Sequence, residues 1–521
     1  MNIRIISMLA LLLFMTIPSI HCLHVYQQQH YQIDRYLTWC YKQRYQSYLS
    51  WRSMFYYIPF LGIAWTRNLW LLILLLLVDS YLLFKVEKNT VYSKKIVYTN
   101  RMKRLCLMLI LLEVTFLCLY VSLLNPIIQI LLAFLCSMAP AVLLIGAAAC
   151  CMPLEEAIKD YYMKDAQNML IANQHCKVIG ITGSFGKTST KNIVNQLLSS
   201  RYYCFMTPAS YNNKMGIALS IRNYIKPYHE YFICEIGGDH IHEIKTLAEF
   251  VNPQIAIITG IGPQHLQTFG SIQNILEEKM QLVEHLSING YAICNRDNDY
   301  IRQYKIKNRC HKIWFGIEQK DVDYRGCNIQ CDECGTSFDV IAHFKTISFK
   351  TKLLGEHNVL NLLAGIAIGD LLNIPMEEMR RTIEQIPYVK HRLEIIKNKD
   401  YTIIDNSYNS NPVSASYALK VLSQMPGRKI IITPGFIDLG KEENFQNRKL
   451  GRSLSKVCDE IILVGKKQSQ YIMKGLKDEN VPYEKVRVVK NRNEAFDELR
   501  KIVIKGDYIL IENDLPDAYN Q

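Results

Sequence analysis

Long apolar runs are concentrated in the first third of the chain, and shorter ones are spaced through the rest. The long runs are Ile5–Ile20, Trp70–Phe84, Leu105–Leu124 and Ile127–Cys151. A run of about 18 or more apolar residues can cross a membrane as a helix, and the last two runs reach that length. The pattern therefore predicts about four transmembrane helices within residues 1–151. The first is expected to be an uncleaved anchor, because no small-residue cleavage site follows it.

Basic residues gather in the segment 85–104, between the second and third apolar runs. Its cations are Lys85, Lys88, Lys94, Lys95, Arg101, Lys103 and Arg104. Lysine and arginine are enriched in the cytoplasmic loops of membrane proteins, so we expect the later part of the chain to lie on the cytoplasmic side. The side of segment 22–67 stays open. Helix parity places it outside, whereas its basic and aromatic residues are typical of a membrane surface.

Beyond Cys176, short β-branched runs alternate with stretches of helical spacing. A first set comprises Tyr231–Glu235, Ile255–Thr259 and Tyr291–Asn295. A second set, starting near Ile395, comprises Tyr401–Asp405, Lys429–Thr433, Glu460–Val464, Val486–Val489 and Tyr508–Ile511. Such alternation is typical of α/β domains with largely parallel sheets. We therefore expect a membrane region at 1–151, a first α/β domain at 152–392 and a second, Rossmann-like α/β domain at 393–521.

The segment Gly180–Thr190 reads Gly-Ile-Thr-Gly-Ser-Phe-Gly-Lys-Thr-Ser-Thr and lies between an apolar run and a helical pattern. Glycines let the backbone turn tightly around an anion, and the loop amides and helix N-terminus then point toward phosphate. Lys187 adds a charge, and the Thr188 hydroxyl suits a magnesium ion. We predict an ATP-binding loop made of Gly183, Ser184, Gly186, Lys187, Thr188 and Ser189.

Three further polar residues are spaced along the first α/β stretch. Glu235 ends one apolar run, His265 follows the next, and Lys279 lies in a helical pattern beyond it. In open α/β sheets, ligands bind where the strands end. A glutamate and a histidine near a phosphate loop predict a second metal position beside ATP. Taken singly, each residue also has a simpler interpretation. Glu235 fits a surface carboxylate, His265 a helix cap and Lys279 a charge on a solvated helix face.

The net charge and the cysteine content indicate which partners and which compartment suit the protein. The 521-residue chain has a formal net charge of +13 and 16 cysteines. The charge suits anionic lipid or phosphorylated substrates, and gives no reason to expect nucleic acid as a partner. The cysteines are scattered along the chain. This spacing favours free thiols in a reducing compartment over a framework of disulfide bonds. Cys327, Cys331 and Cys334, with Cys310 upstream, form only a weak zinc pattern.

Taken together and in order, the motifs resemble the Mur ligase family of ATP-dependent amide-forming ligases. They are most like the branch that adds D-alanyl-D-alanine to a UDP-linked muramoyl tripeptide. The resemblance runs from about Cys176 to the C-terminus. The matching segments are Thr182-Gly-Ser-Phe-Gly-Lys-Thr-Ser189, Tyr211-Asn-Asn-Lys-Met-Gly216, Glu235-Ile-Gly237, His265-Leu-Gln-Thr-Phe-Gly-Ser271 with Lys279, Gly355-Glu-His-Asn-Val-Leu-Asn361, Arg392-Leu-Glu394 and Asp405-Asn-Ser-Tyr-Asn-Ser-Asn-Pro412.

The resemblance implies a role for each matching position. Lys187 would hold the β- and γ-phosphates of ATP, and Arg392 would reach the phosphates from the domain junction. Thr188 and Glu235 would hold one Mg²⁺, and His265 would help hold a second. Lys279 matches a lysine that is carbamylated in the family, which would turn this cation into a metal ligand. Nucleotide contacts are implied for Asn295, Asn358, Asn361, Tyr408, Asn409 and Asn411.

The implied reaction is amide formation through an acyl phosphate, between a muropeptide carboxylate and an amine such as D-alanyl-D-alanine. Membrane helices are predicted where family members carry a UDP-sugar-binding domain. We therefore expect a UDP- or lipid-linked acceptor, contact with membrane lipid, and a multi-pass protein of the bacterial inner membrane with cytoplasmic catalytic domains. Two alternatives are a Mur-type subunit that amidates a lipid-linked precursor with ammonia, and a membrane-anchored regulator that binds ATP without ligation.

The sequence departs from the family pattern at three places. Asn406 stands where an aspartate is usual. Pro434-Gly-Phe-Ile-Asp-Leu-Gly440 replaces the usual Gly-Asp-Met…Glu-Leu-Gly, and Glu512-Asn-Asp514 replaces the usual Lys-Gly-Ser.

Overall fold

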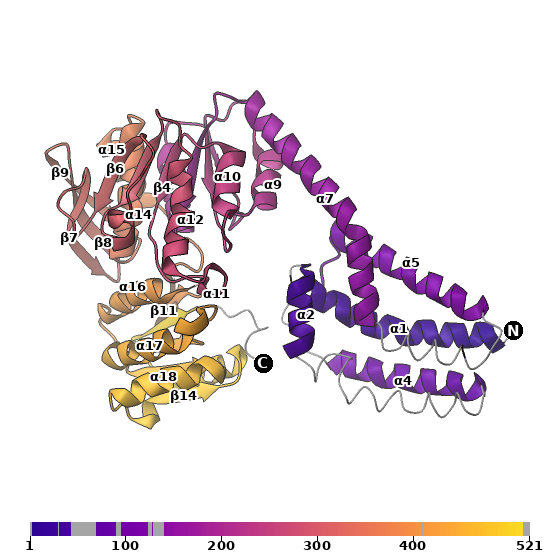
Figure 1. Ribbon diagram of the computed structural model, residues 1–521. Coiled ribbons are helices and arrows are strands. Elements are labelled where there is room, and N and C mark those ends of the chain that lie inside the picture. Colours follow the sequence, from indigo (N-terminus) through magenta and orange to yellow (C-terminus); the bar gives the residue numbers. More distant parts are fainter. Residues whose placement is uncertain are drawn as a thin grey trace. The chain divides into compact units, whose positions relative to one another are not determined.

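The computed structural model describes residues 3–29, 31–42, 69–89, 95–122, 128, 140–408 and 410–513. These residues fall into two compact units, Met1–Tyr161 and Tyr162–Gln521 (Figure 1). The domain boundaries expected after residues 151 and 392 stay predictions.

The first unit is helical. Its helices are α1 (Ile3–Gln28), α2 (Ile33–Lys42), α4 (Leu69–Asn89), α5 (Asn100–Ser122) and the first part of α7 (Pro140–Ala172). Leu11 and Phe14 of α1 are buried in one cluster with Leu72 and Leu76 of α4. The apolar runs thus pack against one another.

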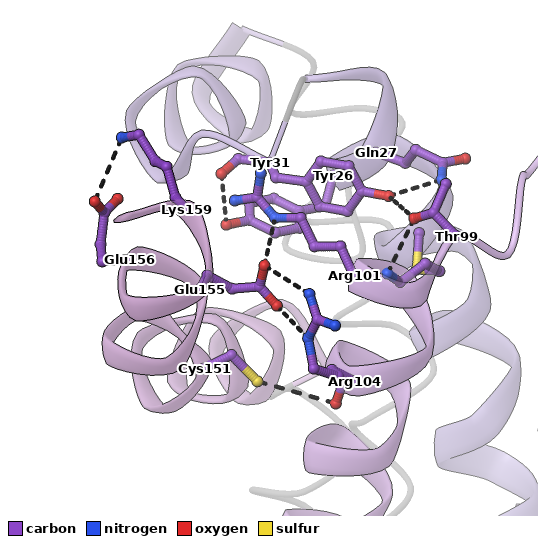
Figure 2. Close-up of polar contacts among 11 residues, drawn as sticks. Tyr26, Gln27, Tyr31, Thr99, Arg101, Arg104, Cys151, Glu155, Glu156 and Lys159 are labelled. Atoms are coloured by element: carbon purple, nitrogen blue, oxygen red, sulfur yellow. Dashed lines mark hydrogen bonds and ion pairs between the residues drawn. The ribbon is translucent and has the colours of Figure 1, made fainter. Parts of the chain in front are cut away.

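Polar contacts tie α7 to α5 and to the turn after α1 (Figure 2). Glu155 of α7 accepts hydrogen bonds from Arg104 Nε at 2.7 Å and Arg104 Nη2 at 2.9 Å. The Arg101 guanidinium lies 4.5 Å from the centre of the Tyr31 ring and also pairs with Glu155. An arginine that meets a carboxylate through two parallel bonds fixes direction as well as distance, so these pairs set the register of the helices.

The prediction of a multi-pass inner-membrane protein is wrong. Within the described ranges, two helices are long and apolar enough to cross a membrane, Ile5–Gln28 and Pro140–Ala172, rather than four. Two such helices are weak evidence, because a core helix of a soluble protein has the same composition, and half of the first one is buried inside the protein. The run Ile127–Cys151 and the segment 22–67 lie partly outside the described residues. Apolar runs of this length also serve to pack helices against each other, which is why hydropathy alone misled.

The second unit is built on two sheets. The first has nine strands in the order β2-β3-β1-β4-β5-β6-β7-β8-β9. Its strands are β1 (Lys177–Thr182), β2 (Cys204–Met206), β3 (Tyr231–Glu235), β4 (Ile255–Ile258), β5 (Tyr291–Asn295), β6 (His311–Gly316), β7 (Tyr324–Asp332), β8 (Gly335–Ala342) and β9 (Lys345–Thr351). The strands are parallel up to the β6–β7 pair, and β7, β8 and β9 are antiparallel.

Helices cover both faces of this sheet, as expected for a parallel α/β sheet. Buried residues of α8 (Lys187–Leu198) and α14 (Glu356–Leu371) share one core with the strands, and those of α9 (Lys214–Tyr224), α10 (Glu243–Val251) and α12 (Ile272–Glu284) share the other. The remaining helices of this part are α11 (Leu266–Phe269), α13 (Asp299–Gln303) and α15 (Met376–Gln385).

The second sheet has six strands in the order β10-β11-β15-β12-β13-β14. They are β10 (Glu394–Lys397), β11 (Tyr401–Asn406), β12 (Lys429–Thr433), β13 (Glu460–Val464), β14 (Val486–Val489) and β15 (Asp507–Glu512), and only β10 runs antiparallel to its neighbour. The helices with it are α16 (Pro412–Ser423), η1 (Gly440–Glu442), α17 (Glu443–Val457), α18 (Lys467–Asp478), η2 (Tyr483–Lys485) and α19 (Arg492–Ile502). The predicted fold class, two α/β units with a phosphate loop in the first, is confirmed.

Helices α17 and α18 approach each other at two glycines. A Cβ atom at Gly451 would collide with the Ile472 carbonyl oxygen, and one at Gly475 would collide with the Arg448 carbonyl oxygen. Because both obstacles are backbone atoms, neither can rotate away. We predict that Gly475→Ala destabilises the protein by about 1–3 kcal/mol, as overpacking does.

Chemical denaturation followed by circular dichroism measures this effect. Gln470→Ala on the exposed face of the same helix is the matched control, and its change should stay within about 0.5 kcal/mol. Equal stability of Gly475→Ala and the parent protein would contradict the close helix packing.

Candidate active site

The loop between β1 and α8 is shaped by two glycines. Gly183 has φ 152° and Gly186 has φ 78°. A Cβ at Gly183 would overlap Thr259 Oγ1, and one at Gly186 would lie 2.7 Å from Asn361 Oδ1. Close backbone approach at these two points requires glycine. The loop therefore has the conformation that the sequence pattern predicts for phosphate binding.

Ser184 fastens this loop to the neighbouring strand end. Its backbone amide donates to the Gly260 carbonyl at 2.7 Å, and its hydroxyl accepts from the Gly262 amide at 3.1 Å. Thr188 and Ser189, in contrast, lie half-buried in the first turn of α8. The predicted nucleotide contacts of all three stay predictions, and the structure adds a loop-fixing role for Ser184.

Lys187 is held inside the loop it follows. Its Nζ donates to the Gly183 carbonyl at 2.6 Å. Burial lowers the pKa of Lys187 to about 8; the nearby Glu235 carboxylate opposes this shift, and Arg392 adds to it. Lys187 is thus a buried cation close to a second cation, Arg392. An anion bound between them would stabilise both charges.

Glu235 ends β3 beside the loop, because β3 pairs with β1 and Glu235 stands opposite Ile181. Its Oε1 accepts a hydrogen bond from Asn212 Nδ2 at 3.1 Å. Its Oε2 lies 3.1 Å from Lys191 Nζ as an ion pair, and both side chains are only 1% exposed. Within the described residues, Oε2 accepts no hydrogen bond with good geometry. A buried carboxylate oxygen that accepts no hydrogen bond is the kind of ligand that Mg²⁺ prefers.

Lys279 is a buried cation on α12. Its Nζ donates to the Gly238 carbonyl at 2.9 Å. Burial lowers the pKa of Lys279 to about 7, and the charge of Lys187 lowers it further, against the opposing carboxylates of Glu278, Glu243 and Asp239. The predicted pair of lysines therefore shares one electrostatic environment, although α8 and α12 lie on opposite faces of the sheet.

His265 lies at the domain junction, directly before α11. It has a left-handed backbone, with φ 51°. Its Nδ1 is 2.7 Å from Oδ2 of Asp438, which comes from the second sheet's domain. The sequence had suggested His265 as a metal ligand, and it had not suggested this partner.

The predicted asparagines hold the active-site loops together. Asn361 Oδ1 accepts from Thr190 Oγ1 at 3.1 Å, and its amide donates to Asn358 Oδ1 at 3.3 Å. Asn358 in turn donates to the Leu354 carbonyl, and Asn295 donates to the Thr259 carbonyl, both at 2.9 Å. These bonds within the protein account for the position of the three amide side chains without a ligand. Their nucleotide contacts therefore stay predictions.

The second α/β domain contributes Arg392 and Tyr408. The Arg392 guanidinium lies 4.7 Å from the centre of the Tyr408 ring, and the Tyr408 hydroxyl donates to Ser210 Oγ of the first domain at 2.8 Å. Burial lowers the pKa of Arg392, against the opposing charge of Glu235. Asn411 caps α16 by accepting from the amides of Val413 and Ser414 at 3.0 Å. Asn409 lies outside the described residues.

Two departures from the family pattern contact each other. Asn406 Nδ2 donates to Glu512 Oε2 at 2.9 Å, and Ser410 also donates to Glu512. Glu512 is fully buried, and this burial raises its pKa to about 7. Each departure was visible in the sequence, but their pairing required the fold.

The ring of His357 lies 5.6 Å from that of Tyr417, across the junction of the two domains. Burial lowers the pKa of His357 to about 4, so this imidazole is neutral at physiological pH. His357 precedes Asn358 in the matched Gly-Glu-His-Asn segment, but sequence reasoning had not singled it out. Tyr417 lay outside every motif.

Comparisons with known proteins agree with this geometry. Residues 181–369 match the Mur ligase middle domain, and residues 391–512 match the family described as Mur ligase, glutamate ligase domain. The UDP-N-acetylmuramoyl-tripeptide--D-alanyl-D-alanine ligase of Buchnera aphidicola is 30% identical over 347 residues, covering 63% of this chain and 75% of that enzyme. The enzymes of the same name from Escherichia coli and Bacillus subtilis are 27% and 28% identical, with 65% and 72% of their lengths covered.

Solved structures show the same fold. MurF from Acinetobacter baumannii superposes with a TM-score of 0.62 at 25% identity, covering 68% of this chain and 77% of that one. MurF from Thermotoga maritima, in complex with ADP, gives a TM-score of 0.62 at 24% identity, covering 68% of this chain and 80% of that one.

The two matched domains, the named relatives and the shared fold define an ATP-dependent carbon–nitrogen ligase. The chain belongs to the Mur ligase family.

We predict that Lys187→Met lowers ATP turnover at least about 100-fold, because removal of one preorganised charge at a reacting phosphate costs that much. Its hydrogen bond goes to a loop carbonyl rather than to the core, so the melting temperature should stay unchanged. Phosphate release and thermal unfolding measure the two effects. Lys474→Met, at an exposed lysine of α18, is the control, and parent-level turnover by Lys187→Met would refute the assignment of the loop.

Proposed function

We propose that the enzyme joins D-alanyl-D-alanine to the free carboxylate of a UDP-linked muramoyl tripeptide, driven by ATP. Similarity to relatives supports this choice of substrates, because the relatives are named as ligases that use this acceptor and this amine. The observation that carries the proposal is the group of charges at the end of the first sheet. The buried Glu235 carboxylate pairs with Lys191 at 3.1 Å and interacts with the charges of Lys187 and Arg392, and Lys187 in turn interacts with Lys279. Acyl phosphate chemistry needs cations at this place, because negative charge accumulates on the transferred phosphoryl group.

The reaction proceeds in two steps. A carboxylate oxygen of the tripeptide attacks the γ-phosphorus of ATP, and ADP leaves with the bond electrons. The amine nitrogen then attacks the acyl carbon, inorganic phosphate leaves, and the nitrogen loses a proton. Lys187 from the loop and Arg392 from the opposite domain bind the phosphoryl oxygens from two sides. Contact between the domains excludes water, which would otherwise hydrolyse the acyl phosphate.

Magnesium fits the residues at this site. Thr188 and Glu235 would hold one Mg²⁺, and His265 with modified Lys279 would hold a second. When bound, the ions neutralise charge on the phosphates. The buried Glu235 Oε2, which accepts no hydrogen bond within the described residues, supports this choice of metal.

Carbamylation would remove the unfavourable positive charge of the buried Lys279 side chain. A buried ammonium with its pKa lowered to about 7 is partly a free amine at neutral pH. The amine nitrogen bonds to the carbon of CO₂ and releases one proton, and a carbamate anion with two oxygen ligands results. This reaction replaces an unfavourable buried cation by an anion facing Lys187.

The decisive assay measures phosphate release by purified protein with ATP, Mg²⁺ and UDP-linked muramoyl tripeptide. We expect release to require D-alanyl-D-alanine, and a single D-alanine or ammonia to support at most a few per cent of that rate. Phosphate release by Lys187→Met under the same conditions measures the background rate. Release that depends on ammonia instead would favour amidation, and release only with a lipid-linked acceptor would contradict the UDP-linked substrate.

For Lys279, we predict that Lys279→Ala loses ligation at least about 100-fold, the cost of removing a preorganised electrostatic group. Acetate or formate should restore part of the activity by supplying a carboxylate, whereas bicarbonate should not. Lys279→Glu should retain more activity than Lys279→Ala. An intact-mass spectrum without the carbamate, combined with full activity of Lys279→Ala, would rule this role out.

A further inference from the structure

We propose that Asp438 positions His265, so that the second metal position is complete only when the two α/β domains are closed on each other. This inference rests on the proposed function, in which His265 is a metal ligand. Asp438 is not part of any site that the sequence motifs assign. It follows β12 in the second sheet, whereas His265 follows β4 in the first.

The contact fixes which nitrogen of His265 carries the proton. His265 Nδ1 lies 2.7 Å from Asp438 Oδ2, and the two side chains are 30% and 38% exposed. An ionised carboxylate only accepts hydrogen bonds, so Nδ1 must be the donor. In the neutral imidazole Nε2 then carries the lone pair, and this is the form of histidine that binds a metal.

The Asp239 carboxylate interacts with His265 through its charge. Asp239 Oδ1 is 2.8 Å from His240 Nδ1. Glu243 Oε2 accepts the amides of Asp239 and His240. The hydrogen bond observed on the His265 ring is the one to Asp438 of the other domain.

The loop that carries Asp438 is held rigidly. Asn447 Oδ1 accepts from the Phe436 amide at 2.8 Å, and Asn447 Nδ2 donates to the Phe436 carbonyl at 2.9 Å. Asn513 donates to the Gly435 carbonyl at 2.9 Å. Asp438 itself has φ 62°, in the left-handed region that aspartate adopts more readily than most other residues. A carboxylate on such a loop can orient an imidazole without moving itself.

Closure brings the two segments together along several residues. A Cβ at Gly440 would lie 3.6 Å from the Gln267 Cα, so the backbone after Asp438 packs on the backbone after His265. A Cβ at Gly262 would lie 3.1 Å from Val413 Cγ2, a second contact between the domains near the phosphate loop. Because Asp438 and His265 come from different domains, their bond cannot form when the domains separate.

A histidine ligand whose other ring nitrogen bonds a carboxylate is held in the correct tautomer and direction, and loss of that partner typically weakens metal binding about 10- to 100-fold. In this ligase the partner arrives with the second domain. Metal binding at His265 and domain closure would therefore favour each other, and the phosphoryl-transfer site would be assembled only after water is excluded.

The test is Mn²⁺ binding to the full-length protein with a non-hydrolysable ATP analogue, followed by electron paramagnetic resonance. Electron spin-echo modulation from a histidine nitrogen reports coordination by His265, and His265→Ala identifies that signal. We expect Asp438→Asn to weaken the Mn²⁺ site that carries this signal at least about 10-fold. Asp438→Ala should weaken it further, while the affinity for the analogue without metal stays unchanged.

Lys420→Met is the matched control. It breaks the 2.7 Å ion pair between Lys420 and Glu356, which joins the same two domains away from His265. Parent-like Mn²⁺ affinity in both Asp438 variants would overturn the inference, and so would an equal loss in Lys420→Met. A parent protein whose spectrum lacks the signal that His265→Ala removes would instead refute His265 as a ligand, and with it the metal assignment in the proposed function.

Discussion

The charge balance around Glu235 is the constraint on which the catalytic unit depends. This carboxylate is buried at the end of β3, and its Oε2 lies 3.1 Å from Lys191 Nζ. Its charge also opposes the lowering of the Lys187 and Arg392 pKa values. Without it, Lys187 and Lys191 would lose this carboxylate, and Arg392 would keep only Glu512 of its two carboxylate interactions. Burial of unpaired charge is costly, so the fold tolerates this cluster because the carboxylate is present and because phosphate is the expected ligand.

The junction of the two α/β domains completes the site. The first domain provides the phosphate loop, Glu235 and Lys279, whereas the second provides Arg392, Tyr408 and Asp438. Direct bonds join them, from Tyr408 to Ser210, from Asp438 to His265 and from Lys420 to Glu356. A reaction with a water-sensitive acyl phosphate benefits from this division, because Arg392 joins the lysines of the first domain only when the domains meet.

The sequence predicted the parts of the fold that follow local rules. The parallel strands, the phosphate loop and its helix were expected at the right positions, since β-branched runs and glycine spacing are local signals. The antiparallel strands β7–β9 were missed, because pairing between them is not encoded by the alternation of strands and helices. The membrane prediction was wrong, because length and hydropathy alone do not distinguish a membrane span from a core helix or a signal sequence of the same composition.

The candidate site was only partly accessible from sequence. Glu235, Lys187 and Arg392 were named from motifs, and the structure brings their charges together. Asp438 and the contact between Asn406 and Glu512 depend on residues far apart in the chain, so no spacing rule could find them. Asn411 caps α16, a role that its motif did not suggest, and its nucleotide contact stays a prediction.

A crystal structure with a non-hydrolysable ATP analogue and Mg²⁺ tests the central claim most directly. The γ-phosphate should lie within hydrogen-bonding distance of Lys187 Nζ and of the Arg392 guanidinium, with a metal ion bound to Glu235. A nucleotide bound elsewhere, or a γ-phosphate contacted by neither cation while Glu235 stays paired with Lys191 alone, would contradict the role given to this charge cluster.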